Sequence, residues 1–137
     1  MTRLLARKRV LILGEDTRSF LSVIRSLGEA GMVVDVVTLI NTTPSLSSKW
    51  ISKVFKLNYQ AFTQNEWQAA LSDIIEKGSY DLVIPCDERS LYPLLDIKEA
   101  SHSSTIFAIP ERDILGPLFD KEQTKQLAEK LGINVAR

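Results

Sequence analysis

Two short polar segments carry the side chains best suited to bind a charged ligand. The first is GEDTRS, residues 14–19, which follows the apolar run RVLIL, and the second is PCDERS, residues 85–90, which follows DLVIP. A carboxylate in such a segment can receive an amino group, and a guanidinium can receive a carboxylate. The predicted substrate-binding residues are Glu15, Asp16, Arg18, Asp87 and Glu88.

The carboxylates also have a structural interpretation, because acidic and hydroxyl side chains often cap the amino end of a helix. For Asp16 and Thr17 we favour a helix cap. For Asp87 and Glu88 two alternatives stay open. They either cap the next helix or receive the amino group of an acceptor substrate.

Arg18 is harder to explain as a structural residue. A guanidinium in the first turn of a helix opposes the helix dipole unless it pairs with a negative group. We expect that partner to be Glu15, Asp87 or a ligand carboxylate.

The first polar segment contains a single glycine, Gly14. The glycine-rich motifs that bind NAD or cradle phosphates are therefore missing.

Cysteine and histidine chemistry is not expected. Cys86 and His102 are the single residues of their kinds, and His102 lies in the serine-rich segment 101–104. A Cys/His catalytic pair is therefore disfavoured, and Cys86 is interpreted as a small buried thiol. We predict no catalytic residue and no metal ligand in this chain. Trp50 and Trp67 are expected to pack rather than stack on a ligand.

The elements that position these segments alternate along the chain. Apolar runs predict strands, and apolar residues at three- and four-residue steps predict helices that Gly31 and Gly78 close. The third strand is expected to lie at an edge of the sheet. The helix at 91–97 is expected to be interrupted near Pro93. Strands are predicted at 9–13, 32–39, 53–57, 81–85 and 105–109, and helices at 17–30, 66–75 and 91–97.

This alternation predicts an α/β fold: a doubly wound parallel sheet of about five strands, with helices on both faces and strand order 3-2-1-4-5. In such sheets ligands bind beyond the carboxyl ends of the strands, where the order reverses. The two polar segments follow the first and fourth predicted strands. We therefore expect them to lie at the same edge of the sheet.

Composition narrows the class of protein further. The chain has 137 residues, 45% of them hydrophobic, and its 17 basic residues balance 17 acidic ones. This balance gives no field that favours nucleic acid or an anionic membrane. No apolar run approaches the roughly 20 residues that span a bilayer. The basic residues 1–8 are interpreted as a solvated leader rather than a targeting signal, and a cytoplasmic location is expected.

Three segments together resemble a known family. They are VLILGEDTRSFLSVIRSLGEAGMVVDVV (residues 10–37), DLVIPCDERSLYPL (81–94) and FDKEQTKQLAEKLGINVAR (119–137). In this order and spacing they resemble the pre-ATP-grasp domain of ATP-grasp ligases, in the branch with carbamoyl-phosphate-synthase-like and amino-acid-ligase-like members. The resemblance implies a Rossmann-like domain over 9–118, followed by a helix and linker over 119–137.

The resemblance implies ATP-dependent ligation through an acyl phosphate, with Mg²⁺ bridging the phosphates and a small carboxylate or amine as substrate. It also implies that Lys121 contacts ATP and that the ATP-binding lobes follow Arg137, so that this fragment is inactive alone and needs that missing domain as its partner. We expect the helix 120–131 to pack on the sheet through Leu127, Ala128 and Leu131. Apolar surface left exposed near it is expected to favour a homodimer.

Two other functions stay open. A receiver domain would form an acidic pocket around a phosphorylated aspartate from GED, residues 14–16, and YDLVIPCDE, residues 80–88, although the separation from Asp16 to Asp87 goes against it and no lysine ends the last strand. A stand-alone module that binds a small acid or nucleotide is the third alternative.

Overall fold

The computed structural model describes residues 6–15, 18–40 and 47–135. Its strands and helices alternate as the sequence predicts, and a short 3-10 helix, η2 (Tyr59–Ala61), follows the third strand. The strands are β1 (Arg9–Gly14), β2 (Val33–Thr38), β3 (Ile51–Lys56), β4 (Leu82–Pro85) and β5 (Ile106–Phe107). The helices are α2 (Arg18–Glu29), α3 (Gln64–Gly78), α4 (Leu91–Ala100), α5 (Arg112–Phe119) and α6 (Lys121–Lys130).

The described part of the chain forms one five-stranded sheet in the order β3-β2-β1-β4-β5, and every pairing is parallel. The predicted fold class and strand order are confirmed. The chain first builds outward from β1 to β2 and β3, and then returns to the other side of β1 with β4. The order therefore reverses between β1 and β4. This is the place where doubly wound sheets bind ligands.

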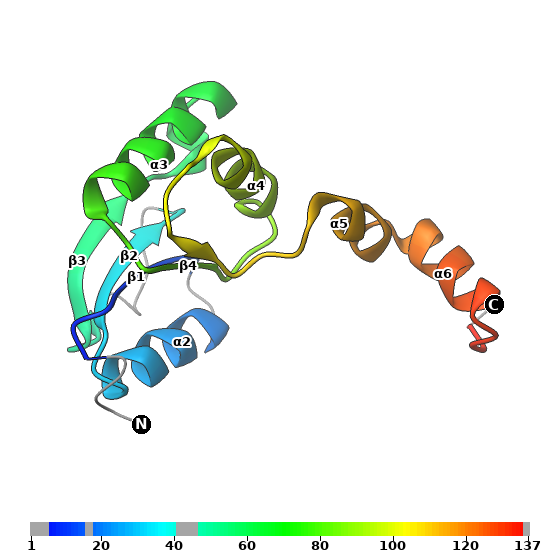
Figure 1. Cartoon of the computed structure of the whole chain (residues 1–137), viewed down its shortest axis with the longest axis horizontal. Helices are drawn as coiled ribbons and strands as arrows, with labels where there is room; N and C mark the ends of the chain where they lie inside the picture. Colours follow the sequence, from blue (N-terminus) through cyan, green and yellow to red (C-terminus); the bar gives the residue numbers. More distant parts are fainter. Residues whose placement is uncertain (1–5, 16–17, 41–46, 136–137) are drawn as a thin grey trace.

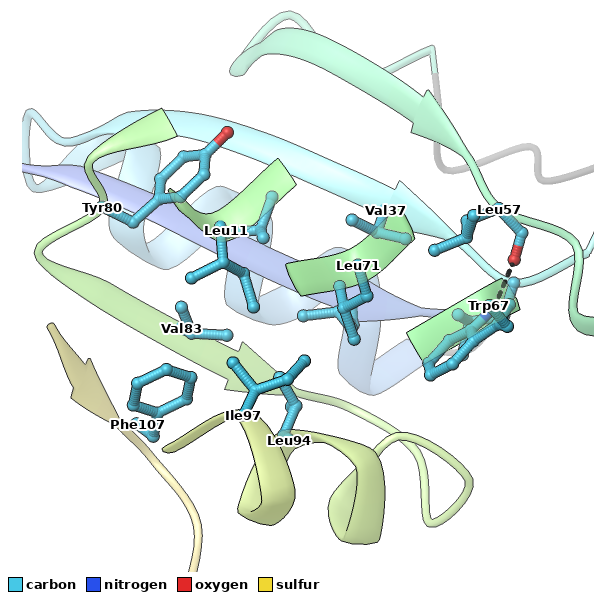
Figure 2. Packing of buried hydrophobic residues seen from close by; sticks show 13 residues of the cluster. Leu11, Val37, Leu57, Trp67, Leu71, Tyr80, Val83, Leu94, Ile97 and Phe107 are labelled. Carbon is cyan, nitrogen blue, oxygen red and sulfur yellow. Dashed lines mark hydrogen bonds between the residues drawn. The ribbon is translucent and has the colours of Figure 1, made fainter. Parts of the chain in front are cut away.

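Helices cover both faces of the sheet (Figure 1). Side chains along β1 alternate between the faces, because successive residues of a strand point to opposite sides. Val10 and Ile12 pack with residues of α2, whereas Leu11 and Leu13 pack with residues of α3 and α4. Figure 2 shows this second cluster between the sheet and those two helices. Both strand faces are thus buried, which explains the continuous apolar run.

Gly28, in α2, marks a close approach between that helix and Trp50, which packs against the same cluster. A Cβ at position 28 would lie 2.6 Å from the Trp50 Cβ, an atom with little freedom to move. Gly28→Ala is therefore expected to lower the free energy of unfolding by about 1–2 kcal/mol, despite the higher helix propensity of alanine. Urea denaturation measures the change. Gly116→Ala, where a Cβ meets nothing within 4 Å, is the control and should not destabilise the domain.

Three local predictions need correction. The helix α4 runs without interruption through Pro93, because a proline in the first turn loses only an N–H that has no helical partner. The left-handed residue after α3 is Ser79, not Gly78. Gly78 instead leaves room for Tyr80, whose ring would lie 2.0 Å from a Cβ at position 78. The fifth strand is confined to Ile106–Phe107.

The helices α5 and α6 form an arm that extends away from the sheet (Figure 1). The predicted packing of the last helix on the sheet is wrong: the side chains of Leu127 and Leu131 are 45% and 68% exposed. The sheet faces are already covered by α2 on one side and by α3 and α4 on the other. The apolar surface expected near this helix is present. At the base of the arm, Arg112 pairs with Asp96 and Glu99 of α4.

Candidate ligand site at the carboxyl edge of the sheet

The ends of β1 and β4 bring the two polar segments together. Leu13 pairs with Pro85, and the Cys86 amide donates a hydrogen bond of 2.7 Å to the Leu13 carbonyl. Glu15 and the segment 86–90 therefore leave the sheet side by side. The prediction that both segments lie at one edge is confirmed for the described residues. Asp16 and Thr17 lie outside the described residues.

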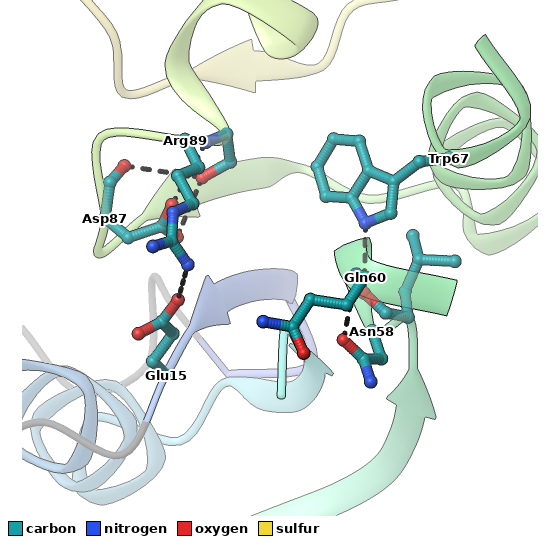
Figure 3. Close-up of polar contacts among 8 residues, drawn as sticks. Glu15, Asn58, Gln60, Trp67, Asp87 and Arg89 are labelled. Atoms are coloured by element: carbon teal, nitrogen blue, oxygen red, sulfur yellow. Dashed lines mark hydrogen bonds and ion pairs between the residues drawn. The ribbon is translucent and has the colours of Figure 1, made fainter. Parts of the chain in front are cut away.

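Arg89 connects these segments, and sequence reasoning did not select it. Its Nη1 atom lies 2.7 Å from Glu15 Oε1, and its guanidinium carbon lies 4.1 Å from the centre of the Tyr59 ring. Figure 3 shows the side chain reaching from the loop after β4 toward Glu15. Its position in the sequence could have indicated this role, because Arg89 is a basic residue in the second polar segment, which was predicted to lie at the same sheet edge as Glu15.

Asp87 caps the turn that precedes α4, whose own N-cap residue, Ser90, has no side-chain cap hydrogen bond. Its carboxylate accepts hydrogen bonds from the Ser90 amide at 3.0 Å and from the Ser90 hydroxyl at 2.9 Å. Burial raises the pKa of Asp87 above its ordinary value, the Ser90 hydrogen bonds oppose that rise, and the nearby Glu15 charge adds to it. Of the two alternatives for Asp87, a cap on the helix itself is not found, because the carboxylate binds Ser90 in the turn before the first helical residue. A ligand contact by Asp87 stays a prediction.

The raised pKa of Asp87 has a consequence for stability. In the unfolded chain the Asp87 carboxyl ionises near its ordinary pKa of 3.8, whereas in the folded protein it stays protonated to a higher pH. Asp87 therefore lowers the stability of the fold as the pH rises from 3.8 through the folded-state pKa. Asp87→Asn keeps an oxygen acceptor for the Ser90 amide but cannot ionise. We expect the stability of the variant relative to wild type to increase by about 0.5 kcal/mol between acid and neutral pH, a small value because the carboxylate is partly solvated. Urea denaturation at several pH values measures this difference, and a decrease would contradict the assignment.

Glu88 and Arg18 make no ion pair with another described residue. Glu88 is exposed and contributes to the wall of a pocket. Arg18 is exposed at the first residue of α2. The expected pairing of Arg18 with Glu15 or Asp87 is not found, since Glu15 pairs with Arg89 and Asp87 accepts from Ser90. A ligand carboxylate as the partner of Arg18 stays a prediction.

A pocket of about 360 Å³ opens beside Arg89, between the ends of β2 and β3 and the starts of α3 and α4. We call it the aromatic pocket. The Trp67 indole in its wall is fixed by a hydrogen bond of 3.0 Å from Nε1 to the Leu57 carbonyl. Its wall includes Leu39, Tyr59, Trp67, Tyr92, Glu88 and Arg89.

Comparisons with known proteins identify the fold. No family model and no curated protein matches the chain. Among solved structures, the biotin carboxylase domain of a single-chain bacterial carboxylase matches with a TM-score of 0.65 and 19% identity, over 93% of this chain and 30% of that one. An L-amino acid ligase from Bacillus licheniformis matches with a TM-score of 0.70 and 12% identity, over 94% of this chain and 30% of that one. The chain has the pre-ATP-grasp fold.

A pyruvate carboxylase from Rhizobium etli matches in the same way, with a TM-score of 0.68 and 13% identity, over 96% of this chain and 13% of that one. The chain thus spans less than a third of each of these three structures. The pre-ATP-grasp fold also contradicts the receiver alternative. Receivers have the strand order 2-1-3-4-5, whereas β1 here lies between β2 and β4.

Two further residues can be placed on the pre-ATP-grasp fold. Burial, followed by the Asp87 charge, raises the pKa of the Cys86 thiol to about 11. The thiol is therefore protonated at neutral pH. His102 lines a different pocket, with Ser79 and Asp81 at the amino edge of the sheet. A Cys86/His102 pair is thus incompatible with the structure.

Lys121, which the family resemblance assigns to ATP, is the exposed first residue of α6. It lies in the arm and outside the cluster at the sheet edge (Figure 1). Asp120 caps this helix by accepting from the amides of Glu122 and Gln123. Contact between Lys121 and ATP stays a prediction.

Proposed function

We propose that this chain is the substrate-side domain of an ATP-dependent carboxylate-amine ligase, or of a related ligase, and that the ATP-binding lobes belong to a longer protein. The match of 93–96% of the chain to carboxylase and ligase structures carries this proposal, because the chain corresponds to only a part of each. In the proposed reaction a substrate carboxylate attacks the terminal phosphorus of ATP and releases ADP. An amine then attacks the acyl phosphate, phosphate leaves, and the amine proton passes to solvent.

The cluster of charges where the strand order reverses supports a substrate-side role. Glu15, Asp87, Glu88 and Arg89 come from two segments at the carboxyl edge, where doubly wound sheets bind ligands. Such a rigid edge can orient a charged substrate toward a second domain. The domain boundaries at 8 and 118 and the substrate contacts of Glu15, Asp16, Arg18, Asp87 and Glu88 are part of this proposal.

Within 6–15, 18–40 and 47–135, no group of three or more His, Cys, Asp or Glu side chains could hold a metal ion. As the family resemblance implies, we assign Mg²⁺ and most ATP contacts to the proposed lobes, and only Lys121 of this chain to ATP. We further propose that the chain alone is inactive and that the exposed apolar surface of its arm promotes dimers.

Two measurements test the proposal. Residues 1–137 should bind ATP with Mg²⁺ no tighter than about 1 mM, and micromolar affinity would contradict the assignment of ATP to other lobes. The intact protein from its native source should release ADP when given its carboxylate, and hydroxylamine should trap the acyl phosphate as a hydroxamate. Release of AMP and pyrophosphate would exclude an acyl phosphate mechanism.

The described helices fit no membrane-spanning role, because none combines the necessary length with the necessary apolar character. The stand-alone binding module stays an alternative. It would be favoured if the intact protein had no ATP-dependent activity.

A further inference from the structure

The aromatic pocket has the size and walls of a site for a small apolar group. Its volume of about 360 Å³ lies in the lower part of the usual range for small-molecule sites, roughly 300–1,000 Å³. The rings of Tyr59, Trp67 and Tyr92 contribute to its wall, together with the fully buried Leu39. Flat aromatic walls favour a planar ligand body, because rings pack best in offset or edge-to-face arrangements.

The charged side chains at the rim of the pocket indicate whether it favours an anionic or a cationic ligand. Arg89 already has two partners: Glu15 at 2.7 Å and the Tyr59 ring at 4.1 Å. A ligand carboxylate would have to displace Glu15. Glu88, in contrast, lines the pocket and has no ion pair with another described residue.

Neighbouring groups add to this preference. Asp87 and Glu15 are two further carboxylates at the same edge, and their mutual repulsion contributes to the raised pKa of Asp87. In the pocket wall itself Glu88 is the carboxylate and Arg89 the cation, and Arg89 is already paired with Glu15. Aromatic faces also attract cations, by about 0.5–2 kcal/mol in proteins.

We propose that the aromatic pocket binds a primary amine with a planar apolar body, and that Glu88 forms an ion pair with its ammonium group. Tyr59 and Tyr92 contact the apolar body, and the largely buried Trp67 packs behind them in the wall. The further role of this amine as the acceptor that captures the acyl phosphate rests on the proposed function. Binding itself requires neither ATP nor another domain.

An NMR titration of residues 1–137 tests the site with three probes of similar shape: 2-phenylethylammonium, neutral 2-phenylethanol and anionic 3-phenylpropanoate. The Trp67 indole N–H, which lies in the wall and is hydrogen-bonded to Leu57, is the reporter. We expect the amine to bind with a Kd of about 1 mM and about fivefold more tightly than the alcohol, and the acid to bind most weakly.

Substitutions separate the charge from the apolar contact. Glu88→Gln should lose about fivefold in affinity for the amine and leave the affinity for the alcohol unchanged. Tyr92→Ala should weaken both probes, because it removes part of the wall. Both side chains are exposed, so the fold should tolerate the changes. Glu122→Gln, on the distant helix α6, is the matched control and should change neither affinity.

Several outcomes would overturn the inference. Tighter binding of 3-phenylpropanoate, lost in Arg89→Met, would make this a carboxylate site. Amine binding that is insensitive to Glu88→Gln, or no response of the Trp67 signal to any probe, would remove the amine site. If the amine binds as expected but the intact protein never forms ADP, the proposed ligase function fails while the site stands.

Discussion

Leu71→Ala is expected to lower the free energy of unfolding by about 3–4 kcal/mol, the largest effect of a single substitution predicted for this domain. Leu71 lies in α3 with no exposed surface, and its side chain contributes to the cluster between the sheet, α3 and α4 (Figure 2). Shortening it removes apolar contacts and leaves a cavity that rigid strands on one side cannot fill. Urea denaturation followed by circular dichroism measures the loss.

Leu127→Ala is the matched control. It makes the same chemical change in a helix, but Leu127 is 45% exposed on the arm. We expect a loss of less than about 0.5 kcal/mol, as for most surface positions. Equal losses at positions 71 and 127 would contradict the position of α6 away from the sheet.

Arg9→Met is expected to have the second largest effect, a loss of about 2–3 kcal/mol. Asp35 is only 2% exposed, and it accepts from Arg9 Nη2 at 2.9 Å and from the Tyr80 hydroxyl at 2.7 Å. Removing the arginine leaves a buried carboxylate without its countercharge, which usually costs about 3–5 kcal/mol. The partial exposure of Arg9 reduces that value. Urea denaturation at neutral pH measures the change.

The double variant Arg9→Met/Asp35→Leu identifies the cause. If the unpaired carboxylate is responsible, removing it should recover part of the stability lost in Arg9→Met, because apolar replacements of a whole buried pair are often neutral. A double variant less stable than Arg9→Met would instead indicate that the hydrogen bond from the Tyr80 hydroxyl to Asp35 dominates. Burial, with Asp35 as a further cause, raises the pKa of Tyr80, so this hydroxyl remains a donor at neutral pH.

The architecture of the sheet could be predicted from the amino-acid sequence. Apolar runs such as residues 9–13 are long enough for strands buried on both faces, and helical periodicity between them requires parallel crossovers. These features gave the strand order, and the order placed the two polar segments at one edge. They are local patterns, in which each residue prefers the same secondary structure as its neighbours. For this reason the class of fold and the location of the site could be predicted.

Contacts between side chains from distant parts of the chain could not be predicted in this way. Arg89 and Glu15 are separated by 74 positions, and their contact depends on the register of β1 with β4 and on the direction of two loops. The aromatic pocket likewise combines residues from four parts of the chain. The position of α6 away from the sheet could not be predicted either. Its apolar residues predict a buried face, but they do not show that other helices already cover the sheet. Distant contacts depend on the assembled packing, and no short stretch of sequence encodes them.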